Sequence, residues 1–89
     1  MSEEHPQQTH TLKTWPVVFD ALLTRAKSFE VRRNDRGFAV GDYLVLQEWS
    51  PSHQHYTGRS VRCLVTYLLP GGQFGIEEGF VCMSIRRLP

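Results

Sequence analysis

The hydrophobic pattern changes its period at Lys27–Arg36, which reads KSFEVRRNDR. Before this segment, apolar side chains recur every three or four residues, as on one face of a helix. Within it, Phe29 and Val31 alternate with polar residues, as in a strand. The alternation predicts that this apolar pair faces the core and that Glu30 and Arg32 share the opposite, exposed face. A helix should therefore end, and a strand begin, close to the start of the segment.

The residues before this segment predict one strand and one helix. His10–Thr14 alternates and suggests a first strand, with Leu12 facing the core. A helix is predicted from about Pro16 to Ala26, because proline suits the first helical turn and an apolar face follows it. That face consists of Phe19, Leu22, Leu23 and Ala26.

The residues after the segment predict three more strands separated by turns. Their ranges are Tyr43–Trp49, Arg59–Leu69 and Phe80–Arg86. Five strands and one helix predict an α+β fold, a small, mostly antiparallel β-barrel closed over the main helix that follows the first strand. We expect residues 1–9 to form a flexible tail and residues 10–89 to form a single domain.

Composition limits the possible functions. The chain of 89 residues has no apolar run long enough to span a membrane and no basic region followed by an apolar block, so a cytoplasmic location is expected. Cys63 and Cys82 are interpreted as small buried hydrophobic residues, and His10 as a solvent-exposed histidine. The pair His53 and His55 lacks further ligands nearby, so neither a metal nor a cofactor is expected.

The charge mildly favours an anionic ligand. Residues 1–10 contain two glutamates and no Lys or Arg, so the rest carries ten basic and seven acidic residues, a net +3. Eight of the ten basic residues are arginine, whose planar fork suits phosphates and base edges. The candidate ligand-binding residues are Lys13, Lys27, Glu30, Arg32 and Arg36.

An aromatic side chain could stack a base, and Trp15, or else Trp49, is the candidate. Each of these candidates also has a purely structural interpretation. A tryptophan beside a helix-starting proline is usually a packing residue, and Glu30 with Arg32 could form a local ion pair worth about 0–1 kcal/mol.

Several segments together resemble the ASCH domains of the PUA-like superfamily, in particular a small bacterial and phage branch of unknown function. They are His10–Lys13, the helix, Lys27–Arg36 and Phe38–Leu44. The resemblance covers about residues 10–87. It implies a PUA-like β-barrel with a basic cleft beside the helix, and a role in binding RNA or a modified nucleoside.

Some ASCH proteins hydrolyse the acetyl amide of N4-acetylcytidine with a Lys, a Thr and a distal Glu. By pattern, Lys27 matches that Lys, Glu30 stands in place of the Thr, and no residue matches the distal Glu. We therefore favour binding of RNA or a nucleotide over catalysis. The alternatives are an amidohydrolase of a modified pyrimidine nucleoside that would use Lys27 and Glu30, and a protein-interaction or regulatory domain. The sequence leaves the oligomeric state open.

Overall fold

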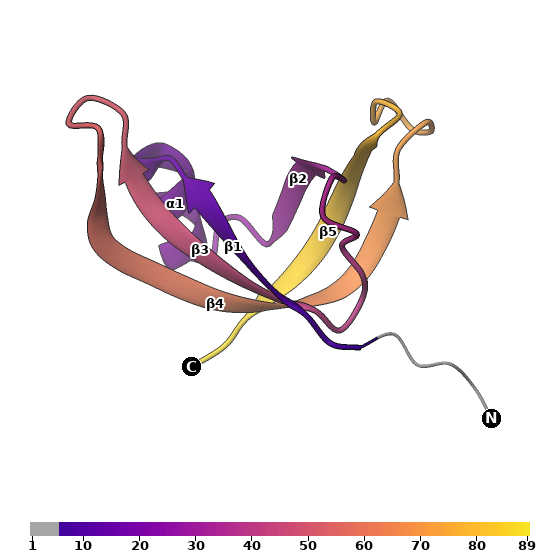
Figure 1. Ribbon diagram of the computed structural model, residues 1–89, viewed down its shortest axis with the longest axis horizontal. Coiled ribbons are helices and arrows are strands. Elements are labelled where there is room, and N and C mark those ends of the chain that lie inside the picture. The colour runs from indigo at the N-terminus through magenta and orange to yellow at the C-terminus, as the bar shows by residue number, and fades with distance from the viewer. Residues whose placement is uncertain (1–5) are drawn as a thin grey trace.

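The computed structural model describes residues 6–89, which fold into a curled five-stranded sheet and one short helix (Figure 1). The elements are β1 (Thr9–Thr14), α1 (Pro16–Leu23), β2 (Phe29–Arg33), β3 (Tyr43–Ser50), β4 (His55–Pro70) and β5 (Phe80–Arg87). The strand order is β1-β3-β4-β5-β2. β1 pairs with β3 in parallel, and the other three pairings are antiparallel.

The sheet is a half-barrel and not the closed barrel that the sequence suggested. β4 is its longest strand, pairing with β3 along its first part and with β5 along its second part. The register shifts between Val65 and Tyr67, and such bulges bend a strand. The bend carries β1 and β2, the two edge strands, onto opposite walls of a trough (Figure 1).

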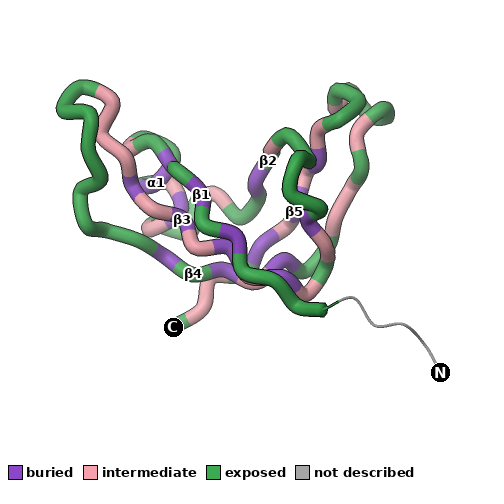
Figure 2. The backbone as a smooth tube through the Cα atoms, viewed as in Figure 1, coloured by how far each residue is buried: buried purple, intermediate pink, exposed green. Residues whose placement is uncertain are grey.

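The core is a cluster of buried residues on one face of the curled sheet, and many of them lie along its base (Figure 2). As predicted, alternate residues of β5 are buried, namely Val81, Met83 and Ile85, and Leu12 of β1 points inward. The helix adds one buried stripe against this face. Other core side chains are Phe19, Leu22, Phe38, Leu44, Leu46, Val61, Cys63 and Val65.

The predicted helix was three residues too long. Helix α1 ends at Leu23 with Thr24 as its cap, and Arg25 then adopts a left-handed conformation with φ +64°. A helix cannot continue through such a residue. Ala26 is consequently exposed and takes no part in the helical face.

The predicted facing of β2 was wrong. Glu30 is 3% exposed and points into the trough, whereas Phe29 and Val31 are 47% and 49% exposed. Burial of a carboxylate is tolerated when cationic groups pair with it, and Lys27 and Arg32 do so here. The alternation was therefore read correctly, but the two faces were exchanged.

The prediction of an exposed His10 was also wrong. The ring is 6% exposed, and its Nε2 lies 2.8 Å from Oδ2 of Asp42. The backbone N–H groups of Gln8 and Ala39 also donate to this carboxylate. Burial by itself would raise the pKa of Asp42, but these hydrogen bonds outweigh it and hold the pKa below its usual value. Asp42 thus ties the start of β1 to the turn before β3.

The start of the chain falls partly outside the described residues. Residues 1–5 of the expected tail lie outside the described residues. Gln7 donates a side-chain hydrogen bond to the carbonyl of Gly41, and Thr9 is the first residue of β1. The ordered contacts of the domain therefore begin before residue 10.

Candidate functional site

A cleft of about 310 Å³ opens between the N-terminal end of α1 and strand β2. We call it the helix cleft. Of the six candidate ligand-binding and stacking residues predicted from the sequence, five line this cleft and Arg36 does not. Those five are Lys13, Trp15, Lys27, Glu30 and Arg32.

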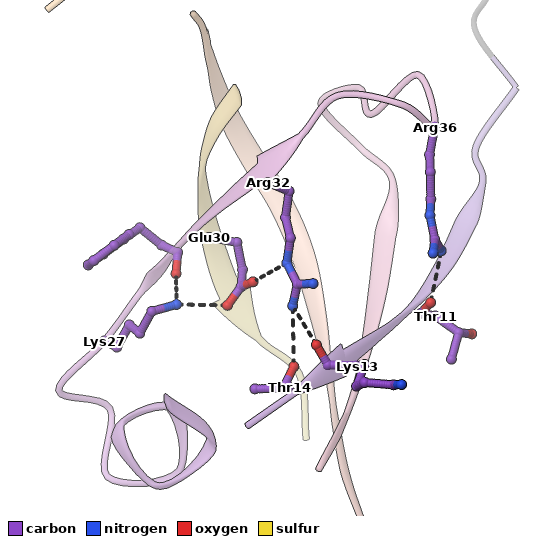
Figure 3. A network of polar contacts seen from close by, with 8 residues as sticks. Thr11, Lys13, Thr14, Lys27, Glu30, Arg32 and Arg36 are labelled. Carbon is purple, nitrogen blue, oxygen red and sulfur yellow. Dashed lines mark hydrogen bonds and ion pairs between the residues drawn. The ribbon is translucent and has the colours of Figure 1, made fainter. Parts of the chain in front are cut away.

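Glu30 lies at the centre of a charged triad in this cleft (Figure 3). Lys27 Nζ donates to its Oε2 at 2.7 Å, and Arg32 Nε donates to its Oε1 at 2.8 Å. The Lys27 ammonium also donates to the backbone carbonyl of Phe29. Two cations and one carboxylate give the triad a net charge of +1. The site is therefore polar, internally paired and mildly attractive to anions.

Arg32 of β2 and Arg36 of the loop after β2 reach across the trough to the other edge strand, β1. Arg32 Nη2 donates to the carbonyl of Lys13 at 3.0 Å, and Arg36 Nη1 donates to the carbonyl of Thr11 at 2.9 Å (Figure 3). These carbonyls lie on the edge of β1 that has no strand neighbour. Side chains thus satisfy backbone groups of β1 that would pair with β2 if the barrel were closed. We call this pair of contacts the arginine seam.

Lys13 lines the cleft mainly through its backbone. Its side chain points away from Glu30 in Figure 3, and its Nζ lies 4.0 Å from the ring centroid of Trp49. Trp49 is half-buried and also packs edge-on against Tyr56. Trp15, in contrast, is 58% exposed at the rim of the cleft. Of the two tryptophans, Trp15 is thus the one free to stack on a ligand.

Sequence reasoning missed a second buried carboxylate on the inner face. Glu48 is 4% exposed, and its two oxygens accept from Arg59 Nε at 2.8 Å and Arg59 Nη2 at 2.9 Å. Hydrogen bonds from Arg59 and then Thr57 lower the pKa of Glu48 despite its burial. The sequence did contain a signal for the burial of Glu48, because this residue continues the alternation of Leu44 and Leu46.

Comparison with known proteins identifies the family to which this chain belongs. Residues 9–85 match the model of a domain of unknown function, DUF3850. The chain belongs to the DUF3850 family. It is also 37% identical over 57 residues to a protein described as an uncharacterized 12.9 kDa protein in the GpA 3' region of Escherichia phage P2. That alignment covers 64% of this chain and 50% of the phage protein, so the chain spans about half the length of this relative.

The DUF3850 match runs from β1 through most of β5 and includes the whole helix cleft. Within residues 6–89 of this DUF3850 domain, no three His, Cys, Asp or Glu side chains are grouped so as to hold a metal ion. No helix in that same range is long and apolar enough to cross a membrane.

Proposed function

We propose that this domain binds RNA or a nucleotide in the helix cleft, as an ASCH-type domain of the PUA-like kind. One observation carries the proposal. Lys27, Glu30 and Arg32 come together in one cleft, with the exposed ring of Trp15 at its rim. A nucleobase requires this combination of a flat apolar surface and polar groups that match its edge.

The triad suits a base edge that carries an amine beside acceptor atoms. Each carboxylate oxygen of Glu30 accepts one hydrogen bond from within the triad. A carboxylate offers about four acceptor sites, so capacity remains for an exocyclic amine such as that of cytosine. Lys27 and Arg32 each carry further donors that can reach a base carbonyl or a phosphate oxygen. The net charge of +1 favours an anionic ligand over a neutral one.

Trp15 supplies the stacking surface. Stacking of a base on an aromatic side chain contributes about 1–3 kcal/mol and is tolerant of sequence. Phe29, which also lines the cleft, is 47% exposed, so the rim carries two accessible rings. This arrangement supports recognition of unpaired bases more than of a duplex, whose bases are stacked on each other.

Titration with short single-stranded RNAs at low salt tests the proposal. Labelled RNA should bind the wild type in the micromolar range, and Lys27→Ala or Trp15→Ala should weaken binding by about tenfold. Arg62→Ala is the matched control, because Arg62 projects over Tyr43 on the outer face of the sheet. No binding at tens of micromolar, or an equal loss in Arg62→Ala, would refute the proposal. Recovery of one protein and no RNA in a pull-down would favour an interaction domain.

A second candidate, an amidohydrolase of a modified pyrimidine nucleoside, is favoured by the 2.7 Å contact between Lys27 Nζ and Glu30 Oε2. Groups this close can pass a proton between them during general acid–base catalysis. Incubation with N4-acetylcytidine would release cytidine if the pair is catalytic, and Glu30→Gln should abolish release. No cytidine at high protein concentration would leave binding as the activity of the cleft.

A further inference from the structure

A second cavity, of about 180 Å³, shares Lys27 with the helix cleft. Its floor is apolar and includes Leu22 and Ile85, and its charged lining residues are all cationic. No carboxylate is among the described residues that line it. We call this cavity the arginine pocket, after its basic residues Arg25, Lys27, Arg86 and Arg87.

Two of these guanidinium groups have no protein partner. Within residues 6–89, neither Arg25 nor Arg86 makes a side-chain hydrogen bond or an ion pair. Arg87 donates to the carbonyl of Leu23 at 2.9 Å and is thereby fixed at the end of α1. Cys63 adds no negative charge, because burial raises the pKa of its thiol. Apart from Lys27, which pairs with Glu30, the basic residues of the pocket have no carboxylate partner within residues 6–89, so the pocket concentrates positive charge.

The backbone at Arg25, which ends helix α1 just after its cap residue, is strained. Its φ of +64° lies in the left-handed region, where a residue with a Cβ atom is less stable than glycine. Helices that end in this manner usually place glycine at the residue after the cap. Glycine would end the helix here with less strain, so replacing Arg25 by glycine can test whether its side chain has a further use.

We propose that the arginine pocket binds phosphate and receives the phosphate group of a nucleotide whose base occupies the helix cleft. The nucleotide part of this proposal rests on the function proposed above, whereas the phosphate site does not. Arginine forks bind phosphate oxygens through paired, charge-assisted hydrogen bonds. Lys27 lines both cavities, so a base and its phosphate can occupy them side by side.

Calorimetric titration with inorganic phosphate, at constant ionic strength, tests the pocket without any nucleotide. Saturable binding should weaken about tenfold or more in Arg86→Ala, which removes a guanidinium donor. Arg62→Ala removes the same charge from the outer face and should leave the affinity unchanged. Non-saturable binding, or equal affinities of the two variants, would overturn the proposal.

Arg25→Gly separates a binding role from a structural one. This variant should raise the melting temperature, because glycine relieves the strain, and lower the phosphate affinity, because a donor is lost. Gln54→Gly is the matched control, since Gln54 has φ +59° in the exposed loop between β3 and β4. It should leave phosphate affinity unchanged. An Arg25→Gly protein that binds phosphate as tightly as the wild type would remove Arg25 from the site.

Cytidine and cytidine monophosphate together distinguish the two proposals. In the wild type, the monophosphate should bind about tenfold tighter than cytidine, and Arg86→Ala should abolish this difference without changing the affinity for cytidine. Binding of both ligands with equal affinity would refute the phosphate pocket and retain the helix cleft. Binding of inorganic phosphate without any binding of cytidine would refute the helix cleft as a nucleoside site and retain the phosphate pocket.

Discussion

Arg32→Ala should destabilise the domain far more than Arg33→Ala, although the two arginines are adjacent in β2. Arg32 points into the trough, where it contacts Glu30, the carbonyl of Lys13 and, at 3.4 Å, Oγ1 of Thr14. Arg33 points outward and lies over the ring of Phe80, 4.8 Å from its centroid. The substitution is chemically identical, so any difference in stability reports the inward contacts.

The expected loss of unfolding free energy follows from these contacts. Removing one partner of a buried ion pair costs about 3–5 kcal/mol. Lys27 would still pair with Glu30, and the Arg32 side chain is 26% exposed, so water screens part of the interaction. The estimate for Arg32→Ala is therefore about 2–3 kcal/mol, and for Arg33→Ala about 0.5–1 kcal/mol.

Urea denaturation monitored by circular dichroism would measure both losses. The double variant with Glu30→Gln then isolates the coupling between Glu30 and Arg32, since the two single losses should not add. If Arg32→Ala were no more destabilising than Arg33→Ala, neither the buried triad nor the arginine seam would contribute to stability as inferred.

Two further predictions concern the stability of the domain at acidic pH and the turn between β4 and β5. The lowered pKa values of Asp42 and Glu48, usually 3.8 and 4.5, mean that their charged forms stabilise the fold. Unfolding free energy should therefore fall as the pH drops below about 4.5, and Asp42→Asn should flatten that slope; an unchanged slope would contradict the assignment. Gly71→Ala should lower the melting temperature, because a Cβ atom would lie 2.0 Å from the carbonyl oxygen of Glu77. Gly72→Ala meets nothing within 4 Å but strains a φ of +88°, so a melting temperature of Gly71→Ala above that of Gly72→Ala would contradict the steric argument.

The sequence predicts most elements because their hydrophobic patterns are local. Alternation in Phe80–Arg87 and Thr9–Thr14 identifies both strands and the inward direction of their apolar residues, such as Leu12 and Met83. In β2 the same alternation is ambiguous, because it does not state which of its two faces is inside. Phe29 and Val31 are apolar enough to suggest the core, yet the charged face of this short edge strand is the inner one.

Other features that the sequence did not reveal depend on pairing between residues far apart in the chain. His10 is buried because Asp42, 32 residues away, accepts its hydrogen bond. The parallel pairing of β1 with β3 and the contact of Arg59 with Glu48 likewise depend on the folded topology. The approach of Lys27 to Glu30 was easier to anticipate, because only three residues separate them.

Because the arginine seam, and not a backbone ladder, joins the two walls of the trough, the distance between them can change more easily than in a closed barrel. A continuous backbone ladder would fix the distance between β1 and β2, whereas long side chains can change rotamer and still keep their hydrogen bonds. Arg32 belongs both to the seam and to the triad in the helix cleft. An anion that recruits this guanidinium must therefore share it with the opposite wall. By linkage, one coupling free energy applies in both directions. A ligand shifts the spacing of the walls by the same free energy by which that spacing changes the affinity for the ligand.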